Sequence, residues 1–120
     1  MKHKTIRNHK DFFATSDDVH AFVVRADCFI VKTKSSKEYG NNRYGLVVTK
    51  KNFKLAVHRN RAKRLLRDWI AFNEDLMLPD LDYILIARTS ILNTSRANGR
   101  EMVYNAFKQI AKLYEQNVKN

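Results

Sequence analysis

The hydrophobic residues of this chain fall into two kinds of pattern. Runs rich in β-branched and aromatic residues, which are typical of strands, occupy residues 21–24, 28–33, 43–49 and 82–88. The last run is almost continuously apolar, so we expect it to be a central strand. The second and third runs are separated by the polar loop 35–42, and we expect them to form a hairpin.

Two longer segments carry apolar residues at helical spacing. The first spans residues 56–76, ahead of Pro79, and the second spans residues 97–115 after a polar connection over residues 93–100. In the second helix, the residues expected to face the core are Val103, Phe107, Ile110 and Tyr114.

A shorter helix over residues 8–18, anchored by Phe12 and Phe13, is expected to come first. The element order is then α-β-β-β-α-β-α. This order predicts an α/β fold of two layers, with helices packed on a small sheet. The length of 120 residues is typical of a single domain, residues 1–120.

The helix over residues 56–76 differs from an ordinary surface helix in its charges. The basic residues between positions 50 and 67 are not interrupted by any Asp or Glu: Lys50, Lys51, Lys54, Arg59, Arg61, Lys63, Arg64 and Arg67. A helix turns by about 100° per residue, so the polar positions from Arg59 to Arg67 cover an arc of roughly 200°. The opposite side is filled by Ala62, Leu65, Leu66, Trp69 and Phe72.

Like charges on one helix face repel each other, so an acid-free basic run indicates an anionic partner. The formal net charge of +11 is typical of a nucleic-acid-binding domain. Guanidinium groups bind phosphate oxygens in a bidentate manner, and the basic side chains of the helix are therefore predicted to contact phosphates. Asn60 either hydrogen-bonds a base or ribose, or organises the neighbouring arginines.

Other features narrow the class of protein. Cys28 is the single cysteine and lies in an apolar run, which indicates a buried, unreactive thiol and no disulfide framework. The basic N-terminus lacks the apolar stretch of a signal peptide, and no run is long enough to cross a membrane. We therefore expect a cytoplasmic protein without a membrane partner. The histidines and carboxylates show no metal-ligand spacing, so neither a catalytic residue nor a metal site is predicted.

Several motifs together resemble the protein subunit of bacterial ribonuclease P. They are R-Y-G-L-V-V-T-K-K at 43–51, A-V at 56–57, R-N-R-A-K-R-L-L-R at 59–67 and D-Y-I-L-I-A-R at 82–88. The link over residues 52–55 departs from the family pattern, because it is one residue longer and lacks the usual glycine.

This resemblance implies a function and a division of labour. The chain would be the protein component of a ribonucleoprotein that removes the 5′ leader from precursor tRNA. The catalytic RNA, with bound magnesium, would hydrolyse the phosphodiester, and the protein would be required but not catalytic. No protein partner and no cofactor bound by the protein alone are implied. The resemblance also implies a left-handed β-α-β crossover through the basic helix.

The resemblance further divides the candidate residues between two RNA surfaces. The basic helix and the loop before it would bind the catalytic RNA through Lys50, Lys51, Arg59, Asn60, Arg61, Lys63, Arg64 and Arg67. A cleft between the first helix and the open face of the sheet would hold the single-stranded leader. The residues expected there are Arg7, Lys10, Phe12, Phe13, Tyr44 and Arg88.

The aromatic residues of the leader set would act as stacking platforms for bases. Further candidates for this role are Phe22, Phe29 and Tyr39, and Lys32 is a further candidate for the cationic track. Two alternative functions remain at this point. One is a ribosomal or general nucleic-acid-binding protein, and the other is a nuclease that acts without an RNA subunit.

Overall fold

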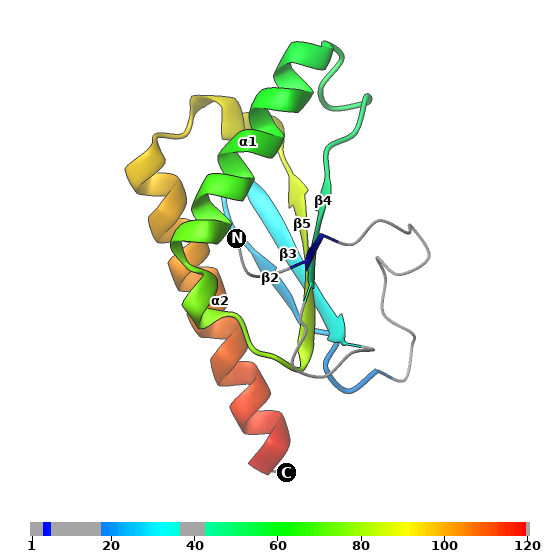
Figure 1. Ribbon diagram of the computed structural model, residues 1–120, viewed down its shortest axis with the longest axis vertical. Helices are drawn as coiled ribbons and strands as arrows, with labels where there is room; N and C mark the ends of the chain where they lie inside the picture. The colour runs from blue at the N-terminus through cyan, green and yellow to red at the C-terminus, as the bar shows by residue number, and fades with distance from the viewer. Residues whose placement is uncertain (1–3, 6–17, 37–42, 120) are drawn as a thin grey trace.

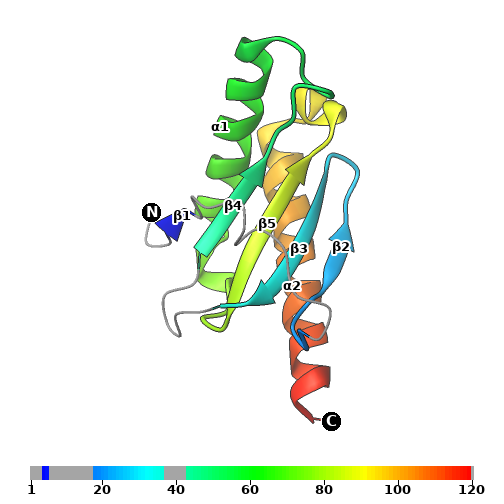
Figure 2. The ribbon, with the colours of Figure 1, turned by 90° about the vertical axis from the view of Figure 1, so that its right-hand side faces the viewer.

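The computed structural model describes residues 4–5, 18–36 and 43–119. It has two layers, a twisted sheet and a pair of helices that cover one face of it (Figures 1 and 2). The strands are β1 (Lys4–Thr5), β2 (Val23–Arg25), β3 (Phe29–Ser35), β4 (Arg43–Val47) and β5 (Leu81–Ala87). The α-helices are α1 (Ala56–Phe72) and α2 (Arg96–Lys119), and short 3-10 turns span Glu74–Leu76 and Thr89–Asn93. The predicted two-layer α/β architecture is confirmed.

Strand β5 occupies the centre of the sheet, as its apolar sequence predicts. The strand order is β1-β4-β5-β3-β2, with β5 parallel to β4 and antiparallel to β3. The predicted hairpin between the strands that became β3 and β4 is therefore wrong. The physical reason is that β5 is buried along nearly its whole length, and such a strand is stabilised most with a partner on each edge.

The connection from β4 through α1 to β5 is a left-handed crossover. Figure 2 views the sheet with the helices behind it, and both strands point upward with β5 to the right of β4. A right-handed crossover with its helix behind the sheet would place the second strand to the left. The left-handed β-α-β crossover that the resemblance implied is therefore present.

Helix α1 packs on the sheet through a narrower stripe than predicted. Its buried residues are Ala62, Leu66, Trp69 and Ile70. Leu65 is only partly buried, and Phe72, predicted to face the core, is 63% exposed. Ile70 takes the place predicted for Phe72, because the helix is rotated so that positions 62, 66, 69 and 70 face inward.

The C-terminus of α1 comes earlier than predicted, at Phe72 rather than residue 76. Asn73 follows it and is buried, and its side-chain amide donates hydrogen bonds to the backbone oxygens of Trp69 (2.9 Å) and Arg100 (3.0 Å). An Asn side chain that binds helix carbonyls in this way competes with continuation of the helix. Asn73 therefore ends α1 and ties it to α2.

Helix α2 begins one residue before the predicted start and extends beyond the predicted end. Val103, Phe107 and Ile110 are fully buried, as predicted, and Tyr114 is partly buried. Gly99 lies against the indole ring of Trp69, and a Cβ atom at this position would lie 2.0 Å from Trp69 Cε2. The glycine therefore permits the close approach of α1 and α2.

Substitution of Gly99 by alanine is expected to destabilise the protein, although alanine favours a helix by about 1 kcal/mol over glycine. Trp69 is fully buried, so its ring has no free space to move into, and overpacking of this kind costs about 1–3 kcal/mol or more. Urea unfolding checks the change. The exposed neighbour Asn98 provides the control, and Asn98→Ala should leave the midpoint nearly unchanged. A Gly99→Ala variant as stable as the parent would contradict this packing.

Candidate nucleic-acid interface

The solvent-facing side of α1 is cationic. Asn60, Arg61, Arg64 and Arg67 are exposed, and Lys63 is half-buried at the edge of this surface. Within the described part of the chain, no carboxylate forms an ion pair with any of the basic side chains of α1. We call Arg61, Lys63, Arg64 and Arg67, together with Asn60, the arginine face.

The single acidic residue of α1 does not neutralise the arginine face. Asp68 accepts hydrogen bonds from Arg100 of α2, at 3.1 Å from Nη2 and 3.2 Å from Nε. The Arg100 guanidinium also lies 4.3 Å from the centre of the Phe72 ring. The carboxylate of Asp68 is thus paired with Arg100 of α2 rather than with the arginine face.

Arg59 has a local structural contact that the sequence did not predict. Its Nη1 donates hydrogen bonds to the backbone oxygens of Phe53 (2.7 Å) and Lys54 (3.0 Å). Phe53 itself is 2% exposed and anchors the link in the core. Arg59 and Phe53 together fix the entry into α1, so the link keeps a defined path without the family glycine.

Lys50 and Lys51 lie in the loop that connects β4 to α1, and both are exposed. The loop is held by a hydrogen bond from the Phe53 backbone N–H to the Thr49 carbonyl oxygen (2.9 Å). In Figure 1 this loop lies beside the first turns of α1. The predicted basic residues before the helix therefore extend the cationic surface past its N-terminus.

The sheet face away from the helices is the second candidate surface. Along β5, Tyr83 and Leu85 belong to the main core, whereas Ile84 forms a separate small cluster with Val47 and Ile86. Tyr44 is in register with Tyr83 and is 5% exposed. Alternation along β4 therefore turns Tyr44 toward the helices, and the stacking role predicted for it is corrected to a core role.

Two further aromatic candidates also belong to the core layer. Phe29 is fully buried, and Phe22 is partly buried and packs against the same core. Five predicted residues lie outside the described residues, as does most of the predicted first helix: Arg7, Lys10, Phe12, Phe13 and Tyr39.

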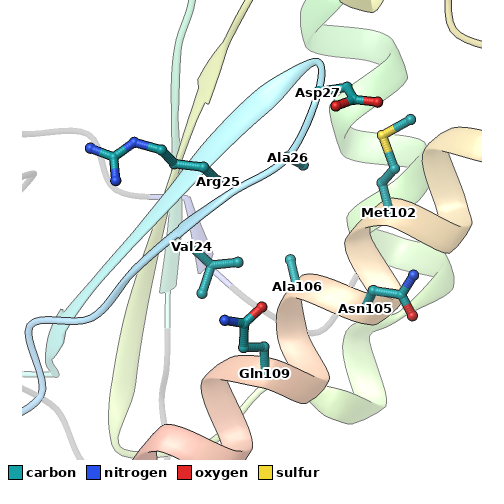
Figure 3. A pocket seen from close by; sticks show the side chains of 8 residues that line it. All are labelled: Val24, Arg25, Ala26, Asp27, Met102, Asn105, Ala106 and Gln109. Carbon is teal, nitrogen blue, oxygen red and sulfur yellow. The ribbon is translucent and has the colours of Figure 1, made fainter.

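Basic side chains lie on or beside the sheet face that points away from the helices, which we call the helix-free face. Arg88, predicted for the leader, is exposed just after β5. Arg25 is exposed on β2, and in Figure 3 it points away from α2 while Val24 points toward the helix. The Asp82 carboxylate is buried between Arg43 Nη2 (2.8 Å) and Lys34 Nζ (3.7 Å). Arg25, Lys34 and Arg43 were not predicted from the sequence. The alternation of basic with other residues along β3 was a signal for Lys34, whereas β2 and β4 carry no such pattern for Arg25 and Arg43.

Figure 3 shows a pocket of different chemistry between the β2–β3 turn and α2. It has a volume of about 230 Å³, and its lining includes Val24, Asp27, Met102, Asn105 and Gln109. Arg25 also borders it but directs its guanidinium elsewhere. An acidic and amide lining of this kind does not suit a polyanion.

Cys28 is buried, as predicted, with its Sγ 3.7 Å from Met102 Sδ. Burial raises the pKa of the Cys28 thiol, and a thiol kept protonated is a poor nucleophile.

Over residues 4–5, 18–36 and 43–119, no three His, Cys, Asp or Glu side chains are grouped as metal ligands would be. Neither of the described helices has the length and apolar character of a membrane span.

The fold and the arginine face define a class, namely a small basic α/β protein with a cationic helix surface of the kind found in nucleic-acid-binding domains. A family model described as Ribonuclease P matches residues 1–111. The ribonuclease P protein component of Marinobacter nauticus is 31% identical over 106 residues, which cover 88% of this chain and 77% of the relative. That of Marinomonas sp. is 31% identical over 111 residues, covering 92% and 82% of the two chains.

The solved structure of the Staphylococcus aureus RNase P protein matches with a TM-score of 0.71 and 28% identity, covering 93% of this chain and 98% of that one. The chain therefore belongs to the ribonuclease P protein family. Its function is that of the protein component of ribonuclease P, in the 5′ processing of tRNA. The alternative of a general nucleic-acid-binding protein is not favoured.

Proposed function

We propose that this chain binds the catalytic RNA of ribonuclease P through the arginine face and the preceding lysines, and precursor tRNA through the helix-free face of the sheet. The RNA, with its bound magnesium, carries out the hydrolysis, and the protein alone is not catalytic. The complex acts in the cytoplasm. Magnesium would be bound mainly by the RNA. Over residues 4–5, 18–36 and 43–119, no three His, Cys, Asp or Glu side chains are grouped as metal ligands.

One observation carries this proposal. The arginine face is exposed and lacks internal carboxylate partners among the described residues, while the opposite side of the same helix is fixed in the core by Leu66, Trp69 and Ile70. A helix held in this way presents its cations without first having to order its backbone, which lowers the cost of binding. A phosphate backbone supplies the negative charge that the face lacks.

The leader surface rests on the helix-free face. Arg25 and Arg88 are exposed there or at its edge. The partly buried Val47 and Ile86 add some apolar area to this face, whereas their neighbour Ile84 is only 1% exposed. Single-stranded RNA is bound by a cationic track combined with apolar or aromatic contacts. The proposed surface keeps Arg88 from the predicted leader set. Val47 and Ile86, which alternate onto the helix-free face, take the place of Tyr44, which faces the core.

Reconstitution tests the division of labour. Purified protein, a bacterial ribonuclease P RNA and precursor tRNA are combined at low magnesium, and release of the leader is followed. We expect cleavage with both components and none with either alone. Cleavage by the protein alone would establish the nuclease alternative. Binding to ribosomal RNA without any effect on the catalytic RNA would contradict the proposed partner.

Binding of the protein to the catalytic RNA should weaken steeply with salt. If about five to eight phosphates are neutralised, the log-log slope of affinity against salt concentration is roughly −4 to −7. Filter binding or fluorescence titration across a range of monovalent salt measures it. A nearly flat dependence would mean that the arginine face is not the main contact.

A further inference from the structure

A second helix contributes to the cationic surface at one point. Arg96, the first residue of α2, joins Arg61 and Arg64 of α1 around a hollow of about 270 Å³, whose lining is completed by Leu65 and Asp68. We propose that this hollow is a phosphodiester site for the RNA backbone and that Arg96 is an RNA-contacting residue. This inference rests on the proposed function and extends its binding surface beyond α1.

The charge around the hollow is strongly unbalanced. Arg61, Arg64 and Arg96 are all exposed, and no described carboxylate forms an ion pair with any of them. Asp68 is the one acid in the lining, and its carboxylate already accepts two hydrogen bonds from Arg100. Three arginines thus line one hollow, and its single carboxylate is already paired with Arg100.

The position of Arg96 is fixed by the packing of the two helices. Ser95 precedes it and caps α2, since its Oγ accepts the backbone N–H of Asn98 (3.2 Å) and its carbonyl oxygen accepts that of Gly99 (2.8 Å). One turn later, the contact of Gly99 with Trp69 sets how closely α2 approaches α1. The backbone at Arg96 is therefore preorganised relative to Arg61 and Arg64.

A phosphodiester matches this arrangement better than a neutral or apolar ligand does. Arg61 and Arg64 are three residues apart and so share one helix face, with Cβ atoms roughly 5–6 Å apart by helix geometry. Guanidinium forks donate paired hydrogen bonds to phosphate oxygens. Leu65 is the one uncharged residue of the lining, and the other four residues are charged, so a charged ligand is favoured over an apolar one. Its place along the arginine face lets one RNA strand contact both helices.

The test compares Arg96→Ala, Arg64→Ala, the double variant and Lys112→Ala. Lys112 is exposed on the same helix as Arg96 but belongs to neither surface, so it controls for loss of one positive charge. Affinity for the catalytic RNA is measured over a range of salt, and urea unfolding of each variant verifies that the fold is kept.

Loss of one solvent-exposed hydrogen-bonding contact predicts binding about three- to tenfold weaker for Arg96→Ala. The salt slope should become shallower by about one unit, and Lys112→Ala should change neither quantity. If Arg64 and Arg96 contact the same phosphate, the double variant loses less than the product of the two single losses.

Two results would overturn the inference. If Arg96→Ala binds like Lys112→Ala while Arg64→Ala is weakened, the arginine face stands but Arg96 is not a contact. If the loss of affinity in the double variant equals the product of the losses in Arg96→Ala and Arg64→Ala, the two residues do not share a phosphate. If the parent protein did not bind the catalytic RNA at any salt concentration, that result would instead contradict the proposed function itself.

Discussion

Substitution of Asp82 by alanine is expected to lower the free energy of unfolding by about 3–5 kcal/mol, as for other buried ion pairs that lose one partner. The Asp82 carboxylate is fully buried, and the side chains of Lys34 and Arg43 beside it are 7% and 16% exposed. Without the carboxylate, two cations stay close together inside a chain whose net charge is already +11. The loss is a large fraction of the stability of a domain this size.

Asp68→Ala is the matched control for this experiment. It also removes one carboxylate paired with an arginine, but the Asp68 and Arg100 side chains are 38% and 29% exposed. Exposed ion pairs contribute at most about 1 kcal/mol, and both variants change the net charge equally. Urea unfolding followed by circular dichroism gives the comparison. Equal losses in the two variants would show that burial of Asp82 does not set its contribution.

The second large effect is expected at the arginine face. The Arg61→Ala/Arg64→Ala double variant should bind the catalytic RNA roughly 10- to 100-fold more weakly, because two solvent-exposed hydrogen-bonding side chains are lost. Both side chains are exposed and have no described carboxylate partner, so the unfolding midpoint should change little. Titration of labelled RNA at fixed salt, together with urea unfolding, separates binding from stability.

The matched control removes two lysines from α2. Lys108 and Lys112 are exposed on that helix, away from the arginine face, and the Lys108→Ala/Lys112→Ala variant has the same net charge as the arginine variant. It should lose far less affinity. If both double variants lost affinity equally, binding would depend on total charge rather than on the arginine face.

Much of the fold was predictable because its signals are local. The apolar run 82–88 predicted a central strand, and the spacing of Val103, Phe107 and Ile110 predicted the buried side of α2. The pairing of strands is not local. The polar loop 35–42 suggested a hairpin, but β3 and β4 both pair with β5, since the most apolar strand is best buried between two neighbours.

The candidate site was predicted best where charge alone defines it. The acid-free run identified the exposed cations of α1, but it could not distinguish Arg59, whose guanidinium binds the carbonyl oxygens of Phe53 and Lys54. Tyr44 was misplaced because a residue's side of the sheet depends on strand register, which became visible only in its pairing with Tyr83. Arg96 lies in a segment expected to be a loop, so its approach to Arg64 depends on how two helices pack.

The central place of β5 also affects the order in which the protein can form. Phe29 pairs with Ala87 and Tyr44 with Tyr83, so the sheet joins segments that are distant in the chain, a topology associated with slow folding. During translation, β3 and β4 have no shared partner until residues 81–87 have been made. The arginine-rich segment is therefore synthesised before the strand and the helix that bury its apolar side.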